Sequence, residues 1–444
     1  MARTFSGRSA HAAYCAAWCS GIEILFHAPR KRSAHSKAIV NPVWDWRPAS
    51  SSERVRTIDI IRGLALFGVL IINILSDFRV PLLEHIRRPF ADSQGADHLV
   101  DLLAAGVLEF KAFTIFSFLF GVGIAIQIER ATTRNVNVRY FLVRRLLWLF
   151  VLGTAHLFLV WNGDILTLYA ICGLLLLPLA GLPSPVLFLI GAALIALPEF
   201  VSFGSRLPSG PAAMAVIAQT RQVYGNQGFL AILKFRWHES WSLIIPLLRM
   251  VLSRTTGLMC WGVAAWRSGI LRAPERHRGK LAAGLAIGLV IGGAITANDV
   301  WGASSGRAPW PALRNTHLDA SILLALAYFS GLLLWLKPRR ISLLPGLAAL
   351  GQMALTNYLV QSIVLGCIFY GYGFGLFGRI GSAAAAGIGL AIYSAQVQLS
   401  RFWLRRFRFG PFEWLWRSLA YGRRQPMWRV RIDPAGAVAR PVEI

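Results

Sequence analysis

The sequence predicts an all-α protein, a polytopic bundle of transmembrane helices. Its 444 residues are 55% hydrophobic and only 15% charged, whereas soluble proteins carry about 25% charged residues. Apolar runs of roughly 18 or more residues recur along almost the whole chain, and each is long enough to cross about 30 Å of hydrocarbon as a helix. Arg and Lys gather in short segments between these runs, which is typical of cytoplasmic loops.

About ten spans are expected, in chain order at residues 58–76, 99–127, 146–161, 165–181, 185–203, 240–265, 281–298, 318–336, 342–370 and 381–400. The second and ninth runs are long enough to be tilted, bent or preceded by an interfacial turn. The segment 204–239 is rich in Gly, Pro and polar residues, so we expect an irregular outer excursion with at most one short amphipathic helix. An even number of spans places both termini on the same side of the membrane.

The basic residues predict which side that is. With the N-terminus inside, the inner segments hold 32 Lys and Arg residues, and the outer segments hold 10. Because positive charge is retained on the cytoplasmic side during insertion, both termini are expected in the cytoplasm. Residues 1–55 then form a basic cytosolic extension, and residues 426–444 form a cytosolic tail.

The formal charge of +26 raises the question of nucleic-acid binding. Its distribution argues against that partner, since the charges follow the loops of a membrane protein. The expected partner is the lipid bilayer, with anionic lipids at the basic loops and at the C-terminal segment "RFWLRRFRFGPFEWLWRSLAYGRR". This segment mixes Arg with Trp and Phe, so we expect it to lie on the inner leaflet.

The first run, "TIDIIRGLALFGVLIINI", carries polar groups that an apolar span rejects unless they are compensated. Asp59 and Arg62 are three residues apart and can pair on one helical face. They form either an anchor at the membrane edge or the wall of a cavity, where Arg62 would meet an anionic group. Asn73 either donates an interhelical hydrogen bond or lines the same cavity.

The passage "RRLLWLFVLGTAHLFLVWNGDILTLYAICG" supplies the candidate catalytic residues. Arg144 and Arg145 begin its span at the inner side. His156 lies about eleven residues further along the apolar helix, where an imidazole needs partners. Asp164 follows in the turn "WNGD". Along one helix the two would be about 12 Å apart, so only a break at Asn162–Gly163 could let Asp164 orient His156 as a general base. In the alternative, His156 bonds a neighbouring helix and Asp164 caps the next one.

Polar residues in later spans extend the candidate cavity. Arg254 lies in the sixth span beside Ser253 and Thr255, where an arginine needs a cavity or an acidic partner. The ninth span contains "GQMALTNYLVQS", in which Gln352, Asn357 and Gln361 suit either a hydrated cavity or interhelical bonding. The chain has no phosphate-binding Gly-rich loop with Lys and Ser/Thr, no HExxH and no CxxC pair, so no metal site is expected.

Five ordered segments together resemble the YeiB-like bacterial inner-membrane proteins, whose C-terminal half is known as domain of unknown function 418. They are "TIDIIRGLALFGVLIINI", "FSFLFGVGIAIQIER", "RRLLWLFVLGTAHLFLVWNGDILTLYAICG", "GQMALTNYLVQS" and "RFGPFEWLWRSLAYG". The resemblance implies an N-terminal membrane half at 56–240, a C-terminal half at 241–425 and an inner-membrane location. His156 and Asp164 belong to this pattern.

The first half is also similar to integral-membrane acyltransferases, which carry an Arg early in the first helix and a His eleven residues later. Arg62 matches that Arg, but Asn73 stands in place of the His. The resemblance implies a membrane-embedded acyl-group transferase for an envelope glycan or lipid-linked acceptor. Arg144 and Arg145 would then receive the phosphates of a donor such as an acyl-CoA, although the need for a cofactor stays open. The alternatives are a transporter for a small anionic solute, lined by Arg254, Gln352, Asn357 and Gln361, and a non-catalytic membrane scaffold.

Overall fold

The computed structural model describes residues 55–88, 90, 93–133, 138–200, 207–305 and 317–429. Throughout these ranges the chain forms helices and the connections between them, and the one β-type contact is an isolated bridge between Phe407 and Trp428. The predicted all-α class is therefore confirmed. The predicted extension 1–55 and tail 426–444 lie almost entirely outside the described ranges.

Long helices alternate with short ones along the chain. The α-helices are α2 (Arg56–Asn73), α3 (Leu82–Arg87), α4 (Gly95–Leu103), α5 (Lys111–Thr133), α6 (Val138–Leu159), α7 (Leu166–Leu179), α8 (Ser184–Phe200), α9 (Gly210–Asn226), α10 (Phe229–Glu239), α11 (Ile245–Arg267), α12 (Arg278–Ile287), α13 (Gly293–Ser305), α14 (His317–Trp335), α15 (Pro338–Ser342), α16 (Pro345–Gln352), α17 (Ala354–Phe369), α18 (Ser382–Arg406) and α19 (Pro411–Tyr421). Four π-helical segments continue or join them, η1 (Ile74–Phe78), η2 (Ala104–Leu108), η3 (Ser240–Ile244) and η5 (Gly288–Gly292), and η4 (Pro274–His277) is a 3-10 turn.

Several of the described helices suit a membrane. Five helical segments are long and apolar enough to cross it, or six if the bent pair α16–α17 counts as one span. Three further apolar helices, α7, α8 and α14, are shorter. Each of the ten predicted runs coincides with helix, but the number ten and the side on which the termini lie stay predictions.

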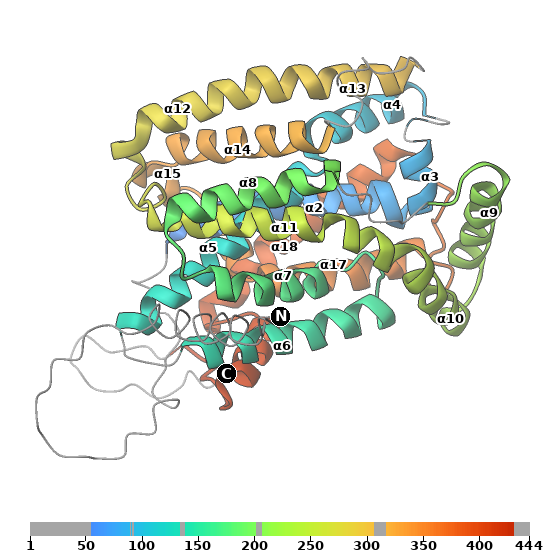
Figure 1. Cartoon of the computed structure of the whole chain (residues 1–444). Helices are drawn as coiled ribbons and strands as arrows, with labels where there is room; N and C mark the ends of the chain where they lie inside the picture. Colours follow the sequence, from blue (N-terminus) through green and yellow to red (C-terminus); the bar gives the residue numbers. More distant parts are fainter. Residues whose placement is uncertain are drawn as a thin grey trace, which may run out of the picture.

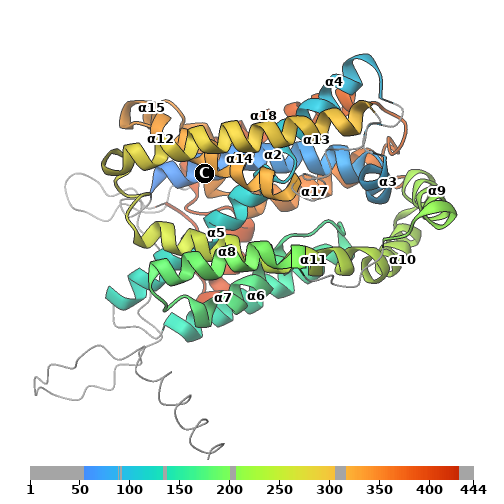
Figure 2. The ribbon, with the colours of Figure 1, turned by 45° about the horizontal axis from the view of Figure 1, so that its top comes forward.

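The bundle has two distinct ends (Figures 1 and 2). Helix α15, the beginning of α12 and the end of α11 lie at one end, whereas α3, α9 and α10 lie at the other. Helix α2 occupies the interior and contacts α5, α16, α17 and α18. The basic segments 267–280 and 337–340 thus share the α15 end.

Small residues allow the central helices to approach closely. A Cβ on Gly351 of α16 would lie 1.8 Å from the carbonyl oxygen of Asp59 on α2. In the same pair, a Cβ on Gly63 would lie 2.4 Å from the carbonyl oxygen of Leu347. Glycines of this kind let helices meet backbone to backbone in membranes, and here they fix the position of α2, which carries Asp59 and Arg62.

Both long runs are interrupted, as their lengths predicted. The ninth is broken at Met353, where α16 and α17 meet at 80°. The second is broken between η2 and α5, where Phe110 has a φ of 59°, a conformation that non-glycine residues rarely adopt. The break at Met353 places the beginning of α17 beside α19.

One surface prediction needs correction, and another stays a prediction. The segment 204–239 is largely helical over its described part, as α9 and α10, because it has protein to pack against. In the C-terminal segment, α19 packs on α6 and buries Glu413 and Trp416. This packing adds a protein contact, and the place of the segment on the inner leaflet stays a prediction.

Candidate functional site

His156 and Asp164 meet through a break in the chain. Helix α6 ends at Leu159 and α7 begins at Leu166, and the turn between them returns the carboxylate to the imidazole. The Nδ1 atom of His156 lies 2.9 Å from Oδ1 of Asp164, and both side chains are buried. The other carboxylate oxygen accepts the backbone N–H of Thr167 at 2.7 Å. Asp164 therefore orients His156 and caps α7 at the same time.

The contact with a carboxylate assigns the donor and acceptor of the pair. A carboxylate only accepts hydrogen bonds, so Nδ1 of His156 carries the proton and Nε2 keeps its lone pair in the neutral ring. Within the described residues, Nε2 is buried and has no hydrogen-bond partner. A buried imidazole with one oriented nitrogen and one available nitrogen can act as a general base.

The turn at 161–164 is held by side chains from three other elements. Trp161 donates from Nε1 to Oδ2 of Asp77 at 2.7 Å, and Asn162 donates from Nδ2 to Oε2 of Glu239 at 2.7 Å. The hydroxyl of Tyr358 on α17 donates to the carbonyl of Gly163 at 3.4 Å.

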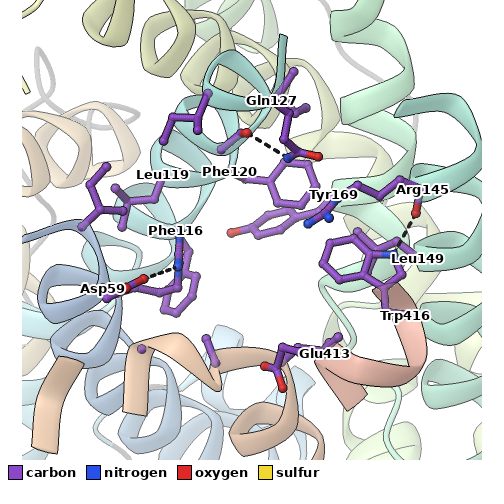
Figure 3. A pocket seen from close by; sticks show the side chains of 18 of the residues that line it. Asp59, Phe116, Leu119, Phe120, Gln127, Arg145, Leu149, Tyr169, Glu413 and Trp416 are labelled. Atoms are coloured by element: carbon purple, nitrogen blue, oxygen red, sulfur yellow. Dashed lines mark hydrogen bonds and ion pairs between the residues drawn. The ribbon is translucent and has the colours of Figure 1, made fainter. Parts of the chain in front are cut away.

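A cavity of about 550 Å³ opens between α2, α5, α6, α7, the α16–α17 break and α19. Figure 3 shows Asp59 and Phe116 on one side of the open space and Arg145 and Trp416 on the other, with Tyr169 pointing into it. The volume is typical of small-molecule sites. Among the described residues, no three His, Cys, Asp or Glu side chains lie together as metal ligands would.

The cavity wall carries several charged side chains. Arg62 forms an ion pair with Asp59 at 3.1 Å. Glu413 is buried, and its oxygens accept from the backbone N–H and the hydroxyl of Thr356 at 3.0 and 2.5 Å. Burial raises the pKa of the Glu413 carboxyl, although the bonds from Thr356 oppose this effect. Burial also lowers the pKa of Arg417, one turn further along α19.

Tyr358 connects the cavity with the His156–Asp164 pair. Its side chain lines the cavity, and its ring centroid lies 5.3 Å from that of His156. Ile165 lines the cavity next to the turn, whereas His156 and Asp164 do not reach its surface. The cavity therefore ends against the residues that cover the pair.

The predicted cavity residues are only partly brought together. Asp59, Arg62, Arg145 and Gln352 line the cavity, and Asn73 and Arg144 lie outside its lining.

The remaining predicted residues have partners elsewhere. Arg254 is buried and paired with Asp319 at 3.0 Å, which is the acidic partner that an arginine in a span requires. Asn357 donates to the hydroxyl of Ser400 at 2.9 Å, and Gln361 donates to Gln396 at 2.7 Å. Asn357 and Gln361 thus bond to α18, which is the interhelical bonding that the sequence offered as one alternative. Of the four residues predicted to line a transport pathway, Gln352 lines this cavity and Arg254, Asn357 and Gln361 do not.

Several site residues escaped the sequence analysis. Those in the cavity wall are Tyr169, Tyr358, Trp416, Arg417 and Glu413, and those around the turn are Asp77, Tyr224, Arg236 and Glu239. Isolated acids and arginines in apolar runs were the available signal, because such residues are costly unless they have a role.

The family of the chain follows from its relatives. It is 34% identical over 414 residues to the uncharacterised protein YxaH of Bacillus subtilis, an alignment that covers 86% of this chain and 98% of the relative. The model of the family described as "Protein of unknown function (DUF418)" matches residues 265–423. This chain belongs to the YeiB-like DUF418 family.

Two further relatives extend the DUF418 assignment. An uncharacterised 39.9 kDa protein from the amylase 3′ region of Bacillus acidopullulyticus is 31% identical, over 86% of this chain and 97% of the relative. The uncharacterised protein YeiB of Escherichia coli is 28% identical, over 83% and 96%. No solved structure matches this DUF418 protein. The matched segment of the family model contains α16, α17 and α19, which form one side of the cavity.

Proposed function

We propose that this protein is an acyl-group transferase of the bacterial inner membrane, with both termini in the cytoplasm, that acts on an envelope glycan or a lipid-linked acceptor. The observation that carries the proposal is the buried contact of 2.9 Å between Nδ1 of His156 and Oδ1 of Asp164, next to the closed end of a cavity. Buried imidazole–carboxylate pairs are the usual means of activating a hydroxyl group.

In the proposed reaction, His156 takes up one proton and later returns it. Nε2 removes the proton of the acceptor hydroxyl while its oxygen forms a bond to the carbonyl carbon of the acyl donor. The bond from that carbon to the leaving group then breaks, and the protonated imidazole returns the proton to the leaving group. Asp164 keeps Nδ1–H oriented and stabilises the imidazolium while it exists. Tyr358 must shift for substrate to reach His156 from the cavity, because its ring covers the pair on that side.

The test compares acyl esters on envelope glycans and lipids, by mass spectrometry, in a deletion strain that carries each variant. We expect His156→Gln and Asp164→Asn to lower the acylated product at least 100-fold, in the range of general-base effects of about 10²–10⁴. His85→Gln is the matched control, because His85 also pairs with a carboxylate, that of Glu109 at 3.1 Å, but lies away from the cavity. A deletion that leaves every acyl ester unchanged, at normal protein levels, would end the transferase proposal.

One observation favours transport as a second candidate. Beyond the His156–Asp164 pair, Asp77, Arg236 and Glu239 continue the series of ionisable groups towards the α9–α10 end. Such groups mark ion or proton pathways in membrane proteins. Uptake of small anionic solutes that depends on His156, with unchanged acyl esters, would support the transporter. If the protein is a non-catalytic scaffold, His156→Ala should have no effect beyond a loss of stability.

A further inference from the structure

Two arginines from distant parts of the chain face the same cavity. Arg145 comes from α6, and its guanidinium carbon lies 3.7 Å from the ring centroid of Trp416. The carbonyl of Arg145 accepts the indole N–H of that tryptophan at 2.8 Å. Arg417 is the next residue of α19 and packs over Phe409 at 4.8 Å. Both arginines line the cavity, and the positive charge of Arg417 acts on Arg145.

Neither arginine has an acidic ion-pair partner within the described residues. Two other arginines, Arg62 and Arg130, also line the cavity, and Asp59 accepts from Arg62 at 3.1 Å. The carboxylate of Glu413 lies on the same helix as Arg417, but its oxygens are occupied by Thr356 at 3.0 and 2.5 Å. Like charges that face one partly desolvated space repel each other, and removing each of them from water is unfavourable. An anion between them would offset both effects.

Although Asp59, Arg62, Glu129, Arg130 and Glu413 add further charged side chains to the lining, the cavity wall also has an apolar part. The side chains there come from α2, α5, α6 and α7, and they include Leu66, Val69, Phe116, Phe120, Leu149 and Leu166. The polar atoms of Tyr169 are already engaged, since its hydroxyl contacts the hydroxyl of Ser117 at 3.1 Å and the carbonyl of Phe113 at 3.3 Å. Figure 3 shows Phe116, Phe120 and Leu149 around the same open space as Arg145. The two arginines thus fit an anion, and the apolar part of the wall fits a hydrocarbon chain.

We infer that Arg145 and Arg417 bind the phosphate-type head group of a single-chain amphiphile whose acyl chain lies among Phe116, Phe120 and Leu149. Guanidinium groups suit this ligand because they donate paired hydrogen bonds to phosphate oxygens. The volume of about 550 Å³ is within the roughly 300–1,000 Å³ range of ligand sites. That this amphiphile is the acyl donor rests on the proposed transferase function. Its binding, however, can be measured without turnover.

The experiment uses the full chain in nanodiscs of neutral lipid and follows binding by native mass spectrometry. The probe is 1-oleoyl lysophosphatidic acid, with 1-oleoylglycerol and inorganic phosphate as separate arms. We expect the probe to bind at least tenfold more tightly than either, because only the probe offers both the anion and the chain. Arg145→Gln and Arg417→Gln should each weaken it at least tenfold, whereas Arg405→Gln, an exposed arginine outside the cavity, should not.

Stability separates a ligand-binding role from a structural one. If the arginines repel each other in the empty protein, Arg417→Gln should unfold at the same or a higher temperature without probe, yet lose the stabilisation that the probe gives. His156→Gln should bind the probe normally, so failure of the transferase chemistry would leave this result intact. Equal binding of 1-oleoylglycerol and the probe, or unchanged probe binding in both arginine variants, would overturn the inference.

Discussion

Asn162 donates a hydrogen bond of 2.7 Å to Oε2 of Glu239, 77 residues further along the chain, and the hydroxyl of Tyr224 donates to the same oxygen at 2.8 Å. The bond joins the turn that carries Asp164 to helix α10. All three side chains are buried, so water does not replace a lost contact. The orientation of the His156–Asp164 pair therefore depends on a helix that neither residue belongs to.

Glu239→Ala is expected to destabilise the protein by about 1–3 kcal/mol for each of the two donors that it leaves without an acceptor. Glu239→Gln is the matched control, because its amide oxygen can accept both bonds that now converge on Oε2. Chemical or thermal unfolding in detergent measures the difference. Equal loss of stability in both variants would show that the charge of Glu239, and not its role as an acceptor, matters.

Tyr358→Phe tests the residue whose ring covers the His156–Asp164 pair. The variant removes the hydroxyl that contacts the carbonyl of Gly163 at 3.4 Å and the N–H of Ile165 at 3.3 Å, but keeps the ring beside His156. We expect a stability loss of about 1 kcal/mol and a partial loss of acylated product. Tyr358→Leu should reduce the product further, since the ring contact also goes. Full activity in both variants would mean that Tyr358 does not position the pair.

Local patterns predicted the long apolar helices and both residues of the His156–Asp164 pair. Hydrophobic runs located these helices, and a break at Asn162–Gly163 was the one route by which Asp164 could meet His156. The cavity could not be predicted in the same way, because Arg145 and Trp416 are 271 positions apart and their contact depends on how α19 packs. The same limit applies to Glu239, in a segment whose Gly and Pro content favoured an irregular loop although it folds as helix.

Interhelical bonding and cavity lining look alike in sequence. Asn357 and Gln361 belong to the same polar motif as Gln352, but the first two bond α18 and the third reaches the cavity. The 80° bend at Met353 makes this difference, since it turns the two sides of the motif in separate directions. A periodic pattern read as one continuous helix does not contain that bend.

Gly351→Ala tests the close contact between α2 and α16. The added Cβ would lie 1.8 Å from the carbonyl oxygen of Asp59, so backbone must move. Overpacking of this kind costs about 1–3 kcal/mol, and the shift of Asp59 should also weaken binding in the cavity. Gly387→Ala on α18 is the control, because a Cβ there meets nothing within 4 Å. In an exposed helix this change is expected to be neutral or to stabilise by up to about 1 kcal/mol. Thermal unfolding of the two variants side by side provides the measurement.

Glu413 predicts how stability varies with pH. Burial raises the pKa of this carboxyl above its ordinary value, so between the two values the folded protein binds a proton that the unfolded chain does not. The contribution of Glu413 to stability is therefore fully present below the ordinary carboxyl pKa of about 4.3 and is lost as the pH rises through the raised pKa.

Glu413→Gln resembles the protonated form and keeps an acceptor for Thr356. The variant should thus lose less stability than the wild type between pH 5 and pH 8, by the order of 1.4 kcal/mol for each unit of pKa shift. Unfolding midpoints of both proteins across that range give the comparison, in which the other buried carboxyls cancel. Parallel curves would show that Glu413 has the same pKa in the folded and unfolded chains.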